Sequence, residues 1–319
     1  MSLDQPIKKK NLLDNNQSLN IILVILFIPV VGLLSILTVS EGTQDENVVY
    51  EKESRYHYIR VVDDNSIRTL FFTKGPGANR QSAIYLDSPD KHVFEYTQMV
   101  FASLAFVQKP QNILVIGLGG GIIPSTFAKH FPAAQIDIVE IDDEVVNVAK
   151  DFFNFNPSSL SNTIVSDGRV YVHQAKNKGL RYDIIVLDAF NGSYIPSHLT
   201  TKEFLQEVFS LLKNGGCVVS NIHHKNKLYE YQQRTYSEVA TQNYTFKGNN
   251  AVIISTQDRD RLSRKEVKKK FSQIQNQFQL SFNLKSIANK LIKRPTWDTE
   301  GDILTDDYSP VNVLKSKKL

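Results

Sequence analysis

Short apolar runs and helical stripes alternate along most of the chain beyond residue 110. The runs Ile113–Ile116, Ile136–Val139 and Ile184–Leu187 are predominantly apolar, which is typical of strands buried on both faces of a sheet. Between the second and third runs, residues 145–152 repeat apolar side chains at helical spacing. Strands that alternate with helices predict an α/β fold built on a doubly wound parallel sheet.

The later part of the chain continues this alternation. Thr200 and Glu203 have the spacing of a capping box and predict the start of a helix, which Asn-Gly-Gly at 214–216 would end. Apolar segments at 217–219 and 251–254 predict two more strands with a helix between them. We therefore expect the parallel sheet to extend to these strands.

Residues 48–86 follow another pattern, in which short β-prone runs are separated by turns. The runs are Tyr58–Val62, Thr69–Thr73 and Ala83–Leu86. They predict a small β-domain over residues 48–92. The main domain would then occupy residues 93–319 and begin with a helix at 94–106.

The chain N-terminal to these domains has three predicted parts. Residues 1–20 are polar and predicted to be disordered, and residues 40–47 form a polar linker. Between them, residues 21–39 carry no charge and are long enough to span a bilayer as a helix. No Ala-x-Ala-like cleavage site follows, so we expect a single-pass membrane anchor. The sequence does not decide on which side of the membrane the catalytic domain would lie, because Lys52 and Arg55 partly balance the lysines that precede the span.

Charge and cysteine content narrow the classes of protein only slightly. A formal net charge of +4 over 319 residues does not imply a nucleic-acid partner. The single cysteine, Cys217, excludes an internal disulfide. His223 and His224 have no third ligand at suitable spacing, so no metal site is predicted and both are expected at the surface.

A glycine-rich turn follows the first strand of the main domain. Gly117, Gly119 and Gly121 stand between this strand and a predicted helix, and the next strand ends in Glu140. Glycines let the backbone approach a ligand, the helix N-terminus offers free N–H groups, and an acid at the second strand can accept ribose hydroxyls. This arrangement predicts a nucleotide site. The spacing Gly-x-Gly-x-Gly favours an adenosyl sulfonium cofactor over a dinucleotide.

Acidic residues follow three successive predicted strands. Glu140, Asp167 and Asp188 would all reach the carboxyl edge of the sheet, where ligands bind in such folds. An NAD-dependent dehydrogenase would leave Asp167, Gly168 and Asp188 without a role, and therefore ranks lower. S-adenosylmethionine is therefore the expected co-substrate.

Five motifs stand in a recognisable order and spacing: VIGLGGG, VEID, SDGR, LDAFN and KEFL…LKNGG. Together they resemble the spermidine synthase family of aminopropyltransferases, above all its membrane-associated spermidine synthase-like members. The resemblance extends over roughly residues 50–310. It implies a Rossmann-like, methyltransferase-type domain behind a small β-domain. It also implies transfer of an aminopropyl group from decarboxylated S-adenosylmethionine to a polyamine acceptor, and it leaves a homodimer open.

The resemblance also implies roles for individual residues. Glu140 would bind the ribose hydroxyls, Asp167 with Gly168 would bind the adenine amino group, and Asp188 would accept the proton of the attacking amine. The further contacts that it implies are Gly117, Gly119, Gly121, Pro196 and His57 for the nucleoside, and Tyr96, Gln98 and Asn191 for the acceptor. His57 stands where the family usually has a glutamine.

Two acids of the family pattern are absent. Gly120 stands where the family has an aspartate that pairs with the propylamine end of the cofactor, and Asn191 stands where a second aspartate holds the acceptor amine. Each lost charged contact is worth roughly 1.5–3 kcal/mol. The alternative enzyme is therefore a methyltransferase that uses intact S-adenosylmethionine. An alternative from another class is a catalytically silent nucleoside-binding module, against which Asp188 argues.

Overall fold

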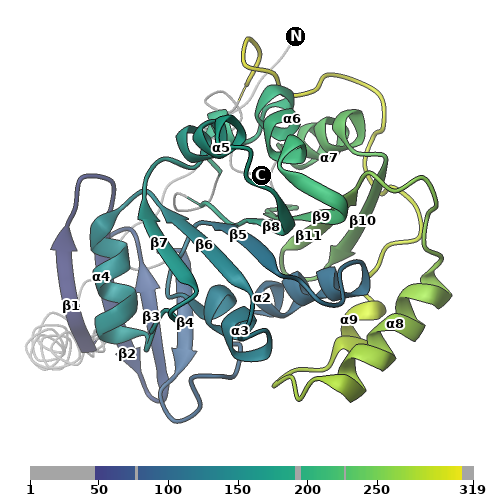
Figure 1. Cartoon of the computed structure of the whole chain (residues 1–319). Helices are drawn as coiled ribbons and strands as arrows, with labels where there is room; N and C mark the ends of the chain where they lie inside the picture. The colour runs from purple at the N-terminus through teal and green to yellow at the C-terminus, as the bar shows by residue number, and fades with distance from the viewer. Residues whose placement is uncertain (1–46, 76–77, 191–194, 226–227, 311–319) are drawn as a thin grey trace, which may run out of the picture. The chain divides into compact units, whose positions relative to one another are not determined.

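The computed structural model describes residues 47–75, 78–190, 195–225 and 228–310. They form one compact unit with two separate β-sheets (Figure 1). The strands of the small sheet are β1 (Asn47–Glu53), β2 (Tyr58–Asp64), β3 (Ile67–Phe71) and β4 (Arg80–Tyr85). The strands of the large sheet are β5 (Asn112–Ile116), β6 (Gln135–Glu140), β7 (Ser161–Val165), β8 (Tyr182–Leu187), β9 (Leu212–Ile222), β10 (Gln242–Lys247) and β11 (Ala251–Thr256).

The helices fall almost entirely between the strands of the large sheet or after them. They are α2 (Glu95–Met99), the 3-10 helix η1 (Val100–Ala105), α3 (Ile122–His130), α4 (Asp143–Phe152), α5 (Gly168–Asn177), η2 (Ser197–Leu199), α6 (Lys202–Ser210), α7 (Leu228–Val239), α8 (Arg264–Gln277) and α9 (Leu284–Ala288). The helix predicted at 94–106 is thus present as α2 and η1. Asp142 caps α4 as expected, by accepting a hydrogen bond from the Glu144 N–H.

The large sheet has the strand order β10-β11-β9-β8-β5-β6-β7. The five strands from β9 to β7 are parallel, which confirms the predicted doubly wound sheet, with its switch point between β5 and β8. The prediction that the parallel sheet extends to residues 251–254 was wrong. β11 runs antiparallel to β9, and β10, which the sequence pattern did not reveal, pairs antiparallel with β11. A tight hairpin can join only antiparallel strands, and the connection from Lys247 to Ala251 is too short for a crossover.

Both faces of the parallel strands are covered by helices (Figure 1). In β5, Ile113 and Val115 enter the core that includes side chains of α3, α8 and α9. Leu114 and Ile116 point to the opposite face and pack in the core of α5, α6 and α7. This alternation explains the uninterrupted apolar run in the sequence, since neither face of the strand meets water.

The small sheet is antiparallel throughout and packs on α4. Val145 and Val148 of α4 enter its core, whereas Val146 and Ala149 belong to the core of the large sheet. The predicted short strands are therefore present as one antiparallel sheet, with one strand more than expected. β1 escaped notice because its side chains are mostly exposed and lack alternation. Its Tyr50 and Lys52 both bond the Glu144 carboxylate of α4.

Two further expectations need correction. Helix α6 is capped by Thr201 rather than Thr200, and it ends at Ser210, so the glycines at 215 and 216 lie inside β9. No helix in the described ranges is long and apolar enough to cross a bilayer. This finding contradicts the predicted single-pass membrane protein, and that localisation is withdrawn. The segment 21–39, on which it was based, lies outside the described residues.

Candidate active site

A cavity of about 440 Å³ opens at the carboxyl ends of the parallel strands. Its wall includes most of the residues singled out in the sequence: Gly117, Gly119, Glu140, Asp167, Gly168, Asp188, Pro196, His57 and Tyr96. Gly121 and Gln98 do not line it. Asn191 lies outside the described residues. The structure thus brings the three acids to one edge of the sheet, as predicted.

The glycine turn brings backbone segments close together. A Cβ on Gly117 would lie 2.4 Å from the carbonyl oxygen of Asp188, so only glycine permits this approach of β5 to β8. A Cβ on Gly121 would meet the Phe155 ring at 2.6 Å. Gly121 therefore serves packing at the start of α3. Gly119 has a positive φ of 54° and faces the cavity.

Glu140 ends β6 and is buried beneath this turn. Its Oε2 accepts a hydrogen bond from the Leu118 N–H at 2.9 Å, and its Oε1 accepts one from the Asp142 N–H at 3.1 Å. Burial raises the pKa of this carboxyl, and the backbone donors oppose the rise. The two oxygens retain lone pairs that can accept a vicinal pair of hydroxyls.

Asp167 caps α5 and contacts a residue that sequence reasoning missed. Its Oδ1 accepts hydrogen bonds from the N–H groups of Arg169 (2.8 Å) and Val170 (3.1 Å), and its Oδ2 lies 2.8 Å from Nε2 of His198. Burial works to raise the pKa of Asp167, but these bonds outweigh it and lower the pKa. The carboxylate can still accept a bond from the cavity side.

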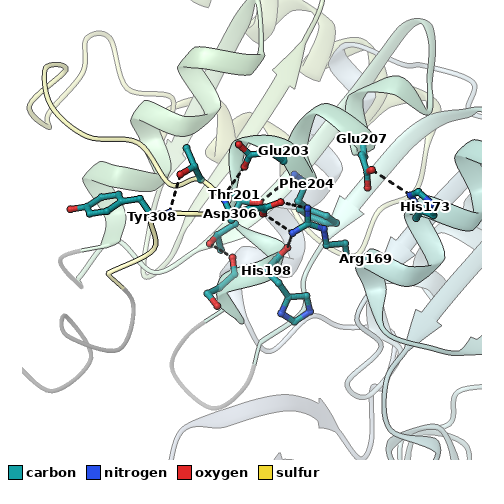
Figure 2. A network of polar contacts seen from close by, with 12 residues as sticks. Arg169, His173, His198, Thr201, Glu203, Phe204, Glu207, Asp306 and Tyr308 are labelled. Atoms are coloured by element: carbon teal, nitrogen blue, oxygen red, sulfur yellow. Dashed lines mark hydrogen bonds and ion pairs between the residues drawn. The ribbon is translucent and has the colours of Figure 1, made fainter.

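A network of ion pairs holds the loop that carries His198 (Figure 2). Arg169 forms a bidentate pair with Asp306 at 2.7 and 2.6 Å and also donates to the carbonyl oxygen of His198 at 3.3 Å. The Asp306 N–H donates to Oε2 of Glu203 at 2.9 Å. The segment near the C-terminus is thereby attached to the cavity wall. No sequence signal linked Asp306 to a site 137 residues away.

Asp188 follows β8 and lies deep in the cavity. Its Oδ1 accepts a hydrogen bond from Nδ2 of Asn221 at 2.9 Å, and its Oδ2 accepts one from the Tyr96 hydroxyl at 3.3 Å. Oδ1 of Asn221 in turn accepts a bond from Nδ2 of Asn250 at 2.9 Å. Burial raises the pKa of Asp188 to about 7, although both donors oppose the rise. A carboxyl group with this pKa can accept a proton at neutral pH and release it again.

The chain resembles proteins of known activity over most of its length. A Spermine/spermidine synthase domain matches residues 93–256. The polyamine aminopropyltransferase of Vibrio vulnificus is 36% identical over 301 residues, which cover 92% of this chain and 98% of the relative.

The chain belongs to the spermine/spermidine synthase family. The predicted resemblance is confirmed, and with it the predicted enzyme class, a transferase of the polyamine aminopropyltransferase type. A homodimer stays a prediction.

Solved structures agree with the fold of a spermidine synthase family member. A crystal structure of spermidine synthase with the transition state analogue AdoDATO has a TM-score of 0.59 at 17% identity, covering 78% of this chain and 86% of that one. Human methyltransferase-like protein 13, in complex with SAH, has a TM-score of 0.53 at 24% identity, covering 69% of this chain and 100% of that one. At these identities the likeness concerns the fold alone.

The place of the family's missing aspartate is occupied by other atoms. A Cβ on Gly120 would lie 2.6 Å from Oγ of Ser82 and 2.8 Å from Cδ1 of Phe153. Ser82 lines the cavity, and Arg80 lies beside it with its guanidinium 5.0 Å from the Phe94 ring centroid. In this member of the spermine/spermidine synthase family, Ser82 and Phe153 thus leave no free space for a side chain at position 120.

Gln98 and His223 differ from expectation in their surroundings, whereas His57 lies at the cavity, where it was expected. His57 lines the cavity and stacks on Phe72 with centroids 4.0 Å apart, and burial lowers its pKa. Gln98 instead donates to the carbonyl oxygen of His92 at 3.3 Å. His223, expected at the surface, lines the cavity with its ring edge against Phe190. Among the described residues, no three potential ligands are grouped as a metal site.

Proposed function

We propose that this member of the family transfers the aminopropyl group of decarboxylated S-adenosylmethionine to an amine of a polyamine acceptor. The observation that carries the proposal is Asp188, a carboxylate with a pKa of about 7 that faces the cavity and is oriented by Asn221 and Tyr96. Family membership over most of the chain supports the same reaction.

The nucleoside would bind at the carboxyl ends of β5, β6 and β7. Glu140 would accept the two ribose hydroxyls, for which its oxygens retain lone pairs. The free lone pairs of Asp167 would accept the adenine amino group, and Gly168 and Pro196 would border the base. Gly117 and Gly119 would let the backbone approach the nucleoside closely. All six residues line the same cavity, which supports this assignment.

The reaction requires an unprotonated amine in line with the carbon beside the sulfonium sulfur. An alkylamine is mostly protonated at neutral pH, so a carboxylate must remove its proton. In our proposal Asp188 takes that proton. The nitrogen lone pair then forms the N–C bond, the C–S bond breaks, and the sulfur keeps the electron pair and leaves as the neutral thioether of methylthioadenosine. Asp188 afterwards releases the proton to water.

Methyl transfer from intact S-adenosylmethionine is the second candidate, because one observation favours it. Ser82 and Phe153 fill the place of the family's carboxylate at Gly120, so the cavity does not repel the cofactor's own carboxylate there. Arg80 also lines the cavity and carries a positive charge. The family and the Vibrio vulnificus relative both favour aminopropyl transfer.

Product analysis with the purified full-length chain tests the proposal. The protein is incubated with a diamine and with either decarboxylated or intact S-adenosylmethionine, and nucleoside products are separated by chromatography. Methylthioadenosine formed from the decarboxylated cofactor, and only in the presence of the amine, supports aminopropyl transfer. S-adenosylhomocysteine formed from the intact cofactor, without methylthioadenosine, would replace it with methyl transfer. The Asp188→Asn variant controls for background hydrolysis.

A further inference from the structure

One part of the cavity wall is polar and runs from Asp188 towards the hairpin between β10 and β11. Asp188, Asn221 and Asn250 form a chain of hydrogen bonds of 2.9 Å each along this wall. The backbone N–H of Asn249, next in the hairpin between β10 and β11, donates to Oε2 of Glu95 at 3.1 Å. All five residues of the wall line the cavity, so two carboxylates, those of Asp188 and Glu95, stand at the ends of one line of amides.

Glu95 is positioned closely against this hairpin. A Cβ on Gly248 would lie 1.9 Å from its Oε2, so the carboxylate lies directly against the backbone of the hairpin. Glu95 lies in the first turn of α2, directly before Tyr96, whose hydroxyl bonds Asp188. It plays no part in the nucleoside site proposed above. Its orientation towards the acceptor side of the cavity therefore calls for another explanation.

Glu95 forms an ion pair with Lys290 of the same chain. The ammonium of Lys290 lies 2.6 Å from Oε1 of Glu95, and both side chains remain partly exposed, at 28% and 31%. The Lys290 backbone is fixed beside β10, because its carbonyl oxygen accepts a bond from the Lys247 N–H at 3.0 Å. The position thus binds a primary ammonium at the end of an alkyl chain, which is the chemistry of an aliphatic diamine or polyamine. A solvent-accessible pair of this kind contributes only roughly 0–1 kcal/mol to stability, so exchange of one ammonium for another costs little.

We propose that Glu95 binds the second, non-reacting ammonium of the acceptor, and that Lys290 occupies this subsite until the acceptor displaces it. The inference rests on the proposed function, in which Asp188 receives the reacting amine. The acceptor would extend along the amides of Asn221 and Asn250, with a cationic nitrogen at each carboxylate. An acceptor with at least two amines is required, and Glu95 supplies a charged contact that uncharged Asn191 cannot.

Steady-state kinetics with two acceptors of equal length, a diamine and a monoamine, test this subsite. Glu95→Gln should lower kcat/KM for the diamine roughly 10- to 100-fold, as expected for loss of one charge-assisted hydrogen bond, and leave the monoamine within about twofold. Lys290→Met removes the competing ammonium and should lower KM for the diamine. Glu238→Gln breaks the ion pair with Lys202, a pair that does not line the cavity, and serves as the matched control.

If Glu95→Gln lowers kcat/KM equally for both acceptors, Glu95 has a structural role. If kcat/KM for the diamine does not fall, Glu95 is not part of the subsite. Titration calorimetry of the diamine against the protein saturated with methylthioadenosine separates this inference from the reaction itself. One outcome would keep the subsite and overturn the proposed function: the wild-type protein forms no product, but Glu95→Gln binds the diamine more weakly than the wild type does. Product formation with unchanged diamine affinity in Glu95→Gln, or no diamine binding to the wild type, would overturn the subsite.

Discussion

Nδ2 of Asn221 lies 2.9 Å from Oδ1 of Asp188, at the end of the neighbouring strand of the sheet. The bond joins an amide with a carboxylate that burial would otherwise keep protonated. It therefore does two things: it holds the carboxylate oxygen in place, and it stabilises the charged form that can accept a proton.

Asp188→Asn should lower kcat roughly 10²- to 10⁴-fold, the usual effect of removing a positioned general base. Asparagine keeps the shape of the side chain but cannot take the proton of the amine. Binding of methylthioadenosine, measured by calorimetry, should change little. Raising the pH should partly restore turnover, because free amine then comes from solution. A loss without rescue at high pH would argue for an acceptor other than an amine.

Asn221→Leu should move the acidic limb of the pH profile of kcat to higher pH. The folded pKa of Asp188 is already raised to about 7 by burial, and Asn221 opposes that rise, so its removal raises the pKa further. A lost charge-assisted bond of roughly 1.5–3 kcal/mol corresponds to about 1–2 pH units. Because the carboxylate is the active form, activity near neutrality falls and recovers in alkali. Asn250→Ala, one bond further away, should shift the limb less; equal shifts would contradict this order.

Glu140→Gln should weaken methylthioadenosine binding by roughly 1.5–3 kcal/mol, since the amide presents one acceptor oxygen instead of two. Glutamine is chosen over alanine because Glu140 also accepts backbone bonds from Leu118 and Asp142, and alanine would leave both unpaired. Circular dichroism confirms that the variant is folded. Unchanged affinity in a folded variant would place the ribose elsewhere.

Asp306→Asn should weaken nucleoside binding without changing the pH profile of kcat. The change weakens the bidentate pair with Arg169. Arg169 supports the loop of His198, and His198 in turn contacts Asp167 in the cavity wall. We expect a roughly 3- to 10-fold rise in the dissociation constant of methylthioadenosine, about 1 kcal/mol. Glu207→Gln is the control, because it alters the 3.5 Å contact with His173 in the same region and leaves the bidentate pair of Arg169 and Asp306 in place (Figure 2). If the two changes have equal effects, the pair of Arg169 and Asp306 is an ordinary surface ion pair with no specific role in nucleoside binding.

Gly120→Ala should lower the free energy of unfolding by roughly 1–3 kcal/mol, as overpacking does in a close-packed interior. The added methyl group would meet Oγ of Ser82 and the ring of Phe153. The hydroxyl of Ser82 can rotate away, whereas the ring is held in the core of the small sheet. Urea unfolding measures the change. Adding Ser82→Gly should recover only part of the stability, and full recovery would identify the serine as the whole obstacle.

The parallel strands and their three acids could be predicted because their signals are local. An apolar run, a glycine turn and a terminal acid lie within 30 residues of one another, and the parallel topology then brings Glu140, Asp167 and Asp188 to one edge. The roles given to these acids stay predictions, as do those of Pro196 and His57. The geometry supports them by placing all five residues in one cavity.

The remaining parts depend on contacts that no local pattern encodes. Asn221 stands inside strand β9, Asn250 in the hairpin between β10 and β11, and Asp306 in a C-terminal segment. In a loop, asparagine or aspartate usually indicates no more than a turn. Glu95 resembled any acid in the first turn of a helix. Its significance appears only when Gly248 and Lys290 lie against it.

The approach of Gly117 to the carbonyl of Asp188 has a consequence for how the enzyme can diverge. The N–H of Asp188 also bonds the carbonyl of Ile116 at 2.8 Å, and the N–H of Gly117 bonds that of Val139 at 2.7 Å. In the proposed reaction, main-chain atoms of three strands would thus set the angle at which donor and acceptor meet. Substitutions of side chains would leave that angle unchanged, but they can replace the groups that bind either end of the reactants. Substitutions in the hairpin and in α2 can therefore change the substrate preference, while the backbone keeps the direction from which the acceptor attacks.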